Sequence, residues 1–226
     1  MVPAALRHRD FSLFWGGGVS LQALRDGMAF LATQPVIVAF MVLDFGATFF
    51  GTSRALLPVY ARDVLHVGPA GLGMLYAASA VGSLLAATGM GLAPNPRRSG
   101  RWVLVAVALY GVCTMVFAVS TAFWLALLML AGAGAGNMVG GVLRNTINQV
   151  LTPDHFRGRV AAVNSIFTMG GPQLGQFESG VVAALWSTEA SALTGGLGAL
   201  LVVWSVAMVP KVRHFRLADD VTQRTG

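Results

Sequence analysis

The chain has 226 residues, of which 55% are hydrophobic and 11% charged, and its mean hydropathy is +0.69. Soluble domains carry about 25% charged residues, so this composition excludes a soluble globular protein and predicts an integral membrane protein. A single cysteine, Cys113, excludes a disulfide framework, and four scattered histidines show no metal-ligand spacing, so we expect neither a metal nor a cofactor.

The first 34 residues are expected to form a cytoplasmic lead outside the main bundle. Their apolar stretch FSLFWGGGVSLQAL, residues 11–24, is too short to cross a bilayer alone. We predict an interfacial helix over residues 4–33. Its lipid-facing side chains would be Phe11, Phe14, Trp15, Leu21 and Leu24. A seventh, tilted span that begins in the same stretch is the alternative.

Six later segments are long and apolar enough to span a membrane. They cover residues 36–60, 71–92, 102–119, 122–150, 159–185 and 191–209. The connections are short, and stretches such as PNPRRSG and LTPDHFRG carry proline and glycine turn signals. We therefore predict an all-α membrane protein with a six-helix bundle over residues 35–210 and a basic, partly disordered tail over residues 211–226.

The basic residues predict the orientation of this bundle. Six spans place both termini on one side, and most of the 15 lysines and arginines fall on that side, whereas the loops of the opposite side hold only Arg62. By the positive-inside rule, both termini are expected in the cytoplasm, with the chain in the bacterial inner membrane. The net charge of +6 is then a topology signal, and no nucleic-acid partner is expected.

Four ionisable residues lie inside predicted spans: Asp44, Arg54, Arg144 and Glu178. Intramembrane charges usually face a partner or a water-filled cavity. Their depths along the spans match Asp44 with Arg144 and Arg54 with Glu178, which requires the first, fourth and fifth spans to be neighbours. These pairs are candidates for a substrate or proton pathway. The alternative is that they only hold the helices together.

The fourth span carries two different faces. One is a glycine stripe for close helix packing, made by Gly132, Gly136 and Gly140. Beside it, at helical spacing, lies a polar stripe of Asn137, Arg144, Asn145 and Asn148. A polar stripe on a membrane helix is expected to face the bundle interior or a cavity, although hydrogen bonding between helices would also explain it.

The fifth span combines a predicted helix break with polar residues. Gly170, Gly171 and Pro172 are expected to interrupt the helix, and Gln173, Gln176 and Glu178 follow. Transporters often bind substrate at such breaks, while a simple proline kink is the alternative. The sequence has no metalloprotease, P-loop or nucleophile-elbow motif, so we do not expect an enzyme.

Several stretches together resemble the major facilitator superfamily, and within it the drug and siderophore exporters similar to the enterobactin exporter. They are RDGMAFLATQPVIVAFMVLDF, SRALLPVYARDVL, GPAGLGMLYAASAVGSLLAA, TPDHFRGRVAAVNSIF and QLGQFESGVVAAL. The resemblance implies that these stretches correspond to helices seven to twelve of such a transporter. LRHRDFSLFWGGGVSLQAL, residues 6–24, is similar to the start of a full-length member.

Two departures from the family bear on function. The family has two six-helix halves, whereas the resemblance covers one half plus a short lead. Whether a natural deletion or an engineered chain explains this difference is left open. In the loop GLAPNPRRSGR, Asn95 stands where the family has an acidic residue, which puts the charge-lock role of that loop in doubt. Arg97, Arg98 and Arg101 of the same loop are expected to contact lipid phosphates.

Two functions follow as expectations. The resemblance implies a half-size exporter of amphipathic small molecules, coupled to protons, with Asp44 and Glu178 as candidate proton sites. A homodimer would cover the polar faces that a lone half exposes. The alternative is a transport-inactive accessory subunit whose polar face is covered by a different membrane protein.

Overall fold

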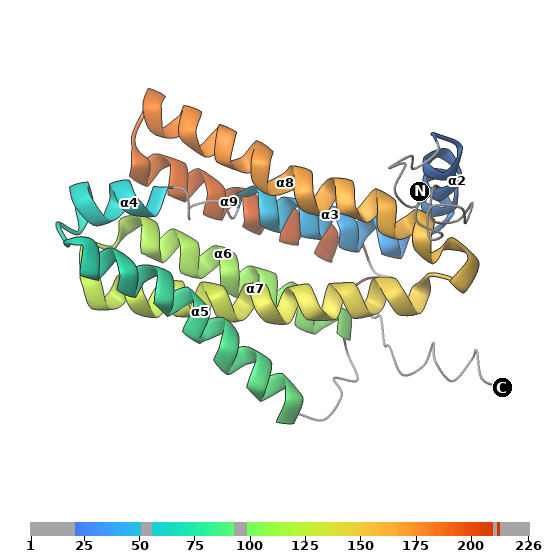
Figure 1. The fold of residues 1–226 in the computed structure, drawn as a ribbon, viewed down its shortest axis with the longest axis horizontal. Helices are drawn as coiled ribbons and strands as arrows, with labels where there is room; N and C mark the ends of the chain where they lie inside the picture. Colours follow the sequence, from blue (N-terminus) through green and yellow to red (C-terminus); the bar gives the residue numbers. More distant parts are fainter. Residues whose placement is uncertain (1–20, 51–55, 93–98, 210–211, 213–226) are drawn as a thin grey trace, which may run out of the picture.

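The computed structural model describes residues 21–50, 56–92, 99–209 and 212, and every regular element in these ranges is helical (Figure 1). The elements are α2 (Leu21–Thr33), α3 (Pro35–Phe50), α4 (Leu57–Val59), the π-helix η3 (Tyr60–Val64), α5 (Pro69–Leu92), α6 (Ser99–Val119), α7 (Phe123–Leu151), the 3₁₀-helix η4 (Asp154–Phe156), α8 (Arg157–Leu185) and α9 (Thr188–Ala207). The predicted all-α class is confirmed.

Within the described ranges, four helices are long and apolar enough to cross a membrane, namely α5, α6, α7 and α9. A fifth crossing results if Gly27–Thr33 and α3 are one span, although they are bent by 109°. The helix α8 has 29 residues but does not reach this level of apolarity, because polar residues such as Gln173, Gln176 and Glu178 lie within it. The predicted span 36–60 begins as α3 and, past residues 51–55, ends in α4 and η3.

The helix α2 lies across the beginning of α8. Its Phe30 ring stacks on Phe156 with 4.6 Å between centroids, and Leu31 belongs to a small buried cluster with Val160 and Val163. Pro35 begins α3, as expected for a residue whose missing amide donor costs nothing in the first helical turn. The predicted lipid-facing residues Phe11, Phe14 and Trp15 lie outside the described residues.

The main helices pack as two groups that meet in the middle of the molecule. In one group α7 lies between α5 and α6, and in the other α3 lies between α8 and α9. The groups join where α6 packs on α9 and α3 on α7. The predicted neighbourhood of the first, fourth and fifth spans is therefore present around α3, with α7 and α8 both in contact with it.

The predicted interruption at Gly170, Gly171 and Pro172 is wrong, because α8 continues through Pro172 to Leu185. Proline removes only one amide donor from the helix, and packing holds the helix on both sides of it. A Cβ at Gly171 would lie 2.6 Å from Oγ1 of Thr48 in α3, and further along, Ser191 of α9 donates a hydrogen bond of 3.0 Å to the Ser179 carbonyl.

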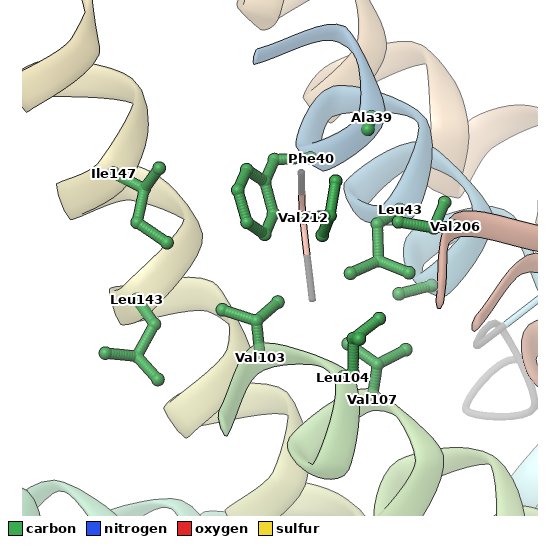
Figure 2. Close-up of a cluster of buried hydrophobic side chains, with 11 residues drawn as sticks. Ala39, Phe40, Leu43, Val103, Leu104, Val107, Leu143, Ile147, Val206 and Val212 are labelled. Atoms are coloured by element: carbon green, nitrogen blue, oxygen red, sulfur yellow. The ribbon is translucent and has the colours of Figure 1, made fainter. Parts of the chain in front are cut away.

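A cluster of buried hydrophobic side chains forms where α3, α6, α7 and α9 meet (Figure 2). It includes Phe40 and Leu43 from α3 and Leu143 and Ile147 from α7, all at most 7% exposed. Leu43 and Leu143 directly precede the two charged residues Asp44 and Arg144 in the sequence. The apolar cluster thereby fixes the rotation and height of the two helices that carry those charges.

Glycines bring α5 and α7 into backbone contact. A Cβ at Gly82 would collide with the carbonyl oxygen of Ala131, and one at Gly134 with that of Ser79. Ser83 also donates a hydrogen bond of 3.0 Å to the Gly134 carbonyl. This reciprocal crossing is the kind of close approach that small residues permit in membrane helices.

The predicted glycine stripe of α7 lies toward α6 over part of its length. A Cβ at Gly136 would lie 2.6 Å from the Ala106 carbonyl oxygen, and one at Gly132 would lie 2.7 Å from the Cys113 sulfur. The third member, Gly140, has a different neighbour, which is described with the site below.

We expect Gly134→Ala to destabilise the protein by about 1–3 kcal/mol, because the new methyl group meets backbone that cannot move alone. Gly141→Ala is the matched control, since a Cβ there meets nothing within 4 Å. Thermal unfolding of the purified protein in mild detergent measures both. Equal midpoints for the two variants would contradict the close crossing of α5 and α7.

Candidate functional site

The centre of the candidate site is an ion pair between α3 and α7. Both Nε and Nη2 of Arg144 donate to the same oxygen of Asp44, Oδ1, at 2.8 and 2.7 Å. The Arg144 side chain is 3% exposed and that of Asp44 is 16% exposed. The predicted pairing of Asp44 with Arg144 is therefore confirmed. Because a charge in an apolar interior is costly without a partner, each residue depends on the other.

The second carboxylate oxygen of Asp44 is held more loosely. The Thr168 hydroxyl of α8 lies 3.4 Å from Oδ2, and the same hydroxyl has a shorter hydrogen bond, 2.9 Å, to the Asn164 carbonyl. A hydroxyl has one proton to donate, so the stronger bond within α8 competes with the bond to Asp44. Oδ2 is thus the less tightly held of the two carboxylate oxygens of Asp44.

Gly140 makes room for the Arg144 guanidinium. A Cβ at this position would lie 2.9 Å from Nη1 of Arg144, and Nη1 has no hydrogen-bond partner within the described part of the chain. The glycine that the sequence assigns to helix packing therefore also permits the arginine side chain to lie along its own helix toward Asp44.

Beside this pair lies a first cavity of about 290 Å³, which we call the upper cavity. Its wall comes from five helices and mixes apolar groups with hydroxyl and amide groups. The polar members are Thr48 of α3, Ser79 of α5, Tyr110 and Thr114 of α6, Asn137 of α7 and Gln176 of α8. Apolar walls with a few polar groups are typical of small-molecule sites.

A second cavity of about 380 Å³, the lower cavity, lies between the end of α7 and the beginning of α8. Its wall is formed by Asn145, Asn148, Gln149, Val150, Thr152, Arg157, Val160, Ala161 and Asn164. The oxygens Oδ1 of Asn148 and Asn164 are buried and have no hydrogen-bond partner among the described residues.

The ion pair lies between the two cavities along the helices. On α8, Asn164 lines the lower cavity, Thr168 contacts Asp44 one turn later, and Pro172 lines the upper cavity after one further turn. On α7, Asn137 lines the upper cavity and Asn148 the lower one, with Arg144 between them. Asp44, Arg144 and Thr168, here called the ion-pair cluster, thus separate the cavities.

The other predicted site residues are less concentrated. Gln173 is exposed and lines neither described cavity, and Glu178 is half-buried on α8, also away from them. Arg101 is half-buried in the first turn of α6. Arg54, Arg97 and Arg98 lie outside the described residues, so the pairing of Arg54 with Glu178 and the lipid contacts of the loop stay predictions.

Sequence reasoning did not assign Thr48 or Tyr110 to the site. Thr48 could have been found from its spacing, because it lies one turn from Asp44 in the same span. Tyr110 gave no such signal. Among the described residues, no group of three or more His, Cys, Asp or Glu side chains could hold a metal ion.

Helices of membrane-spanning length and apolarity, with a buried ion pair between cavities, define an α-helical integral membrane protein. The family model MFS_3, transmembrane secretion effector, matches residues 19–225, and the chain belongs to this family. The major facilitator resemblance is thereby confirmed, and the membership places the chain among transport proteins and not among enzymes.

Curated relatives agree with this assignment. The chain is 27% identical to the enterobactin exporter EntS of Escherichia coli strain K12 over 197 residues, which are 87% of the chain and 47% of the relative. It is 26% identical to the EntS of Citrobacter koseri over 202 residues, 89% of the chain and 48% of the relative. The chain therefore spans about half the length of the curated relatives it matches. No solved structure gives a significant match.

Proposed function

We propose that this chain forms the cavity-bearing half of a proton-coupled exporter for amphipathic small molecules, with both termini in the cytoplasm. The observation that carries the proposal is the ion-pair cluster, which lies between two cavities with mixed apolar and polar walls. If the Asp44 carboxylate takes up a proton, its ion pair with Arg144 changes, and with it the contact between α3 and α7. Because α3, α7 and α8 all contribute to the cluster, a change in its charge affects three of the helices that surround the cavities.

The proton step would act through the strength of the ion pair. While Asp44 is ionised, its two bonds to Arg144 hold α3 against α7. Protonation removes the negative charge and leaves only neutral acceptors for the arginine, so the contact weakens and the helices can separate. Asp44 is the favoured proton site because it contacts Arg144 and Thr168, which lie along α7 and α8 between residues that line the two cavities. Glu178, the other carboxylate of the predicted pathway, is the second candidate.

The proposal includes a two-fold dimer, because α8 leaves much of its surface uncovered. Thr168, Gln173 and Gln176 are exposed on it, and so are the large apolar side chains of Met169 and Phe177 at 73% and 74%. A second copy would cover the polar part of this surface. An accessory subunit that docks to a larger membrane complex is the competing function, and the same uncovered surface would then meet a different protein.

One preparation tests both functions. The full chain is purified in mild detergent, sized, and reconstituted into vesicles loaded with a fluorescent amphipathic dye. We expect a dimer, and dye movement that depends on an imposed proton gradient. Co-purification with a larger assembly, together with vesicles that retain their dye under the gradient, would support the accessory function instead.

A further inference from the structure

We propose that the lower cavity is a binding site of its own for a small amphipathic acid, a compound whose apolar body carries two hydrogen-bond donors and one anionic group. The proposal rests on the export function for its biological role, since a compound held here would lie on the other side of the ion-pair cluster from the upper cavity. Each of the three chemical features follows from a separate part of the cavity wall.

The need for donors follows from two asparagines. Asn148 is 9% exposed, and its Oδ1 has no hydrogen-bond partner among the described residues. The same holds for Oδ1 of Asn164 on the opposite helix. Buried polar atoms in native proteins nearly always have partners. Both residues line the same cavity, so a rotation of each amide group would turn its oxygen toward the cavity, where a ligand with two hydroxyl groups could supply both donors at once.

The need for an anionic group follows from Arg157. This residue lines the cavity, and none of the other described lining residues is acidic or basic. Its partner outside the lining is Asp154, at 3.0 Å, but the two side chains are 59% and 88% exposed. Exposed ion pairs of this kind contribute little, so the guanidinium can exchange Asp154 for an anionic group of the ligand. Among the described lining residues, Arg157 carries the only charge, and it would repel a cationic ligand. Binding of a cation is therefore disfavoured.

The apolar body matches the rest of the wall. Val150, Val160 and Ala161 present hydrocarbon surface between the amide groups. The volume of about 380 Å³ falls within the range of about 300–1,000 Å³ that is typical of small-molecule sites. A planar ring with substituents at its edge would place apolar faces against these side chains and direct its polar groups toward the asparagines and Arg157.

The site is separate from the upper cavity in composition as well as in place. The upper cavity shares no lining residue with it and contains no charged side chain among its described residues. One turn of α8 separates Asn164, which lines the lower cavity, from Thr168 of the ion-pair cluster.

The test uses 3,5-dihydroxybenzoate as the probe, because it has two hydroxyl donors, one carboxylate and an aromatic ring. Its comparison is 3,5-dimethoxybenzoate, which keeps the ring and the charge but replaces each hydroxyl donor by a larger methoxy group that cannot donate. Binding to the purified full chain is measured by isothermal titration calorimetry without a proton gradient. Only variants that elute at the position of the unmodified chain in size-exclusion chromatography are compared.

We expect saturable binding of the dihydroxy probe and weaker binding of the dimethoxy compound. Asn148→Leu and Asn164→Leu should each weaken binding by roughly three- to tenfold, as expected for one lost hydrogen bond. Arg157→Gln should weaken the binding of both compounds. Thr146→Val, on the same helix but outside both cavities, is the control that should bind as the unmodified chain does.

Three results would overturn the proposal: no saturable binding of the dihydroxy probe, equal binding of the dimethoxy compound, or a loss in Asn137→Leu as large as that in Asn148→Leu, which would place the probe in the upper cavity. If Asn148→Leu does not fold, Asn164→Leu and the two compounds carry the same test. Binding without gradient-driven efflux would contradict only the export function, and efflux without probe binding would contradict only the lower site.

Discussion

Arg144→Leu is expected to destabilise the protein by about 3–5 kcal/mol, the usual cost of removing one partner of a buried ion pair. The loss is large because the Asp44 carboxylate, 16% exposed, would lose its ionic partner and would keep, among the described residues, only the Thr168 hydroxyl at 3.4 Å. Arg144 itself is 3% exposed, so water does not replace it. Thermal or denaturant unfolding in mild detergent measures the change.

Two further variants separate the ion pair from simple loss of an arginine. In the double variant Asp44→Asn with Arg144→Leu, most of the stability should return, since the uncompensated charge is gone. Arg157→Leu removes an arginine from an exposed pair with Asp154 and should cost less than about 1 kcal/mol. If Arg144→Leu were no more harmful than Arg157→Leu, the buried pair would not be a structural element.

Asp44→Asn is expected to abolish proton-driven dye efflux while the protein remains folded. Like the protonated carboxyl group, the asparagine amide is a neutral acceptor, so its contact with Arg144 is weaker than the ion pair and stays weak, while the apolar packing of the surrounding helices keeps the protein folded. The side chain can no longer take up or release a proton, so the contact cannot alternate between its strong and weak forms. Loss of transport with retained folding is the combination that a purely structural ion pair would not produce. Efflux from reconstituted vesicles, with and without a gradient, measures it.

Matched variants locate the proton site. Asp44→Glu keeps a titratable group and should retain part of the gradient dependence, while Thr168→Val keeps the carboxylate and should lower the rate less than Asp44→Asn does. Glu178→Gln changes the other candidate carboxylate, which adjoins neither described cavity. Gradient-driven efflux that survives Asp44→Asn but disappears in Glu178→Gln would transfer the proton role to Glu178.

The agreement between sequence and structure is best for features that depend on position along a helix. Asp44 and Arg144 lie in apolar segments, so each needed a partner, and matching their depths was enough to pair them. The two cavities could not be predicted in this way. Their separation depends on how α7 and α8 are rotated toward each other. It also depends on Thr168, and a threonine is compatible with both polar and apolar surroundings, so its presence alone does not indicate a cavity.

Two other differences have similar physical causes. Pro172 suggested a broken helix because local preference was considered without the packing of Gly171 and Ser179 that holds α8 together. The crossing of α5 and α7 depends on Gly82 and Gly134 lying at the same height. Glycine is frequent in this chain, and only the relative register of two helices distinguishes the glycines in contact from those in open space, such as Gly141.

The position of Cys113 has a practical consequence. It is the only cysteine of the chain, and it lines the upper cavity, where its sulfur faces Gly132. The native sequence therefore provides one thiol inside the cavity and none elsewhere. Because Cys113 is 6% exposed, its rate of reaction with a small thiol reagent measures how often the cavity opens, without any prior removal of competing cysteines.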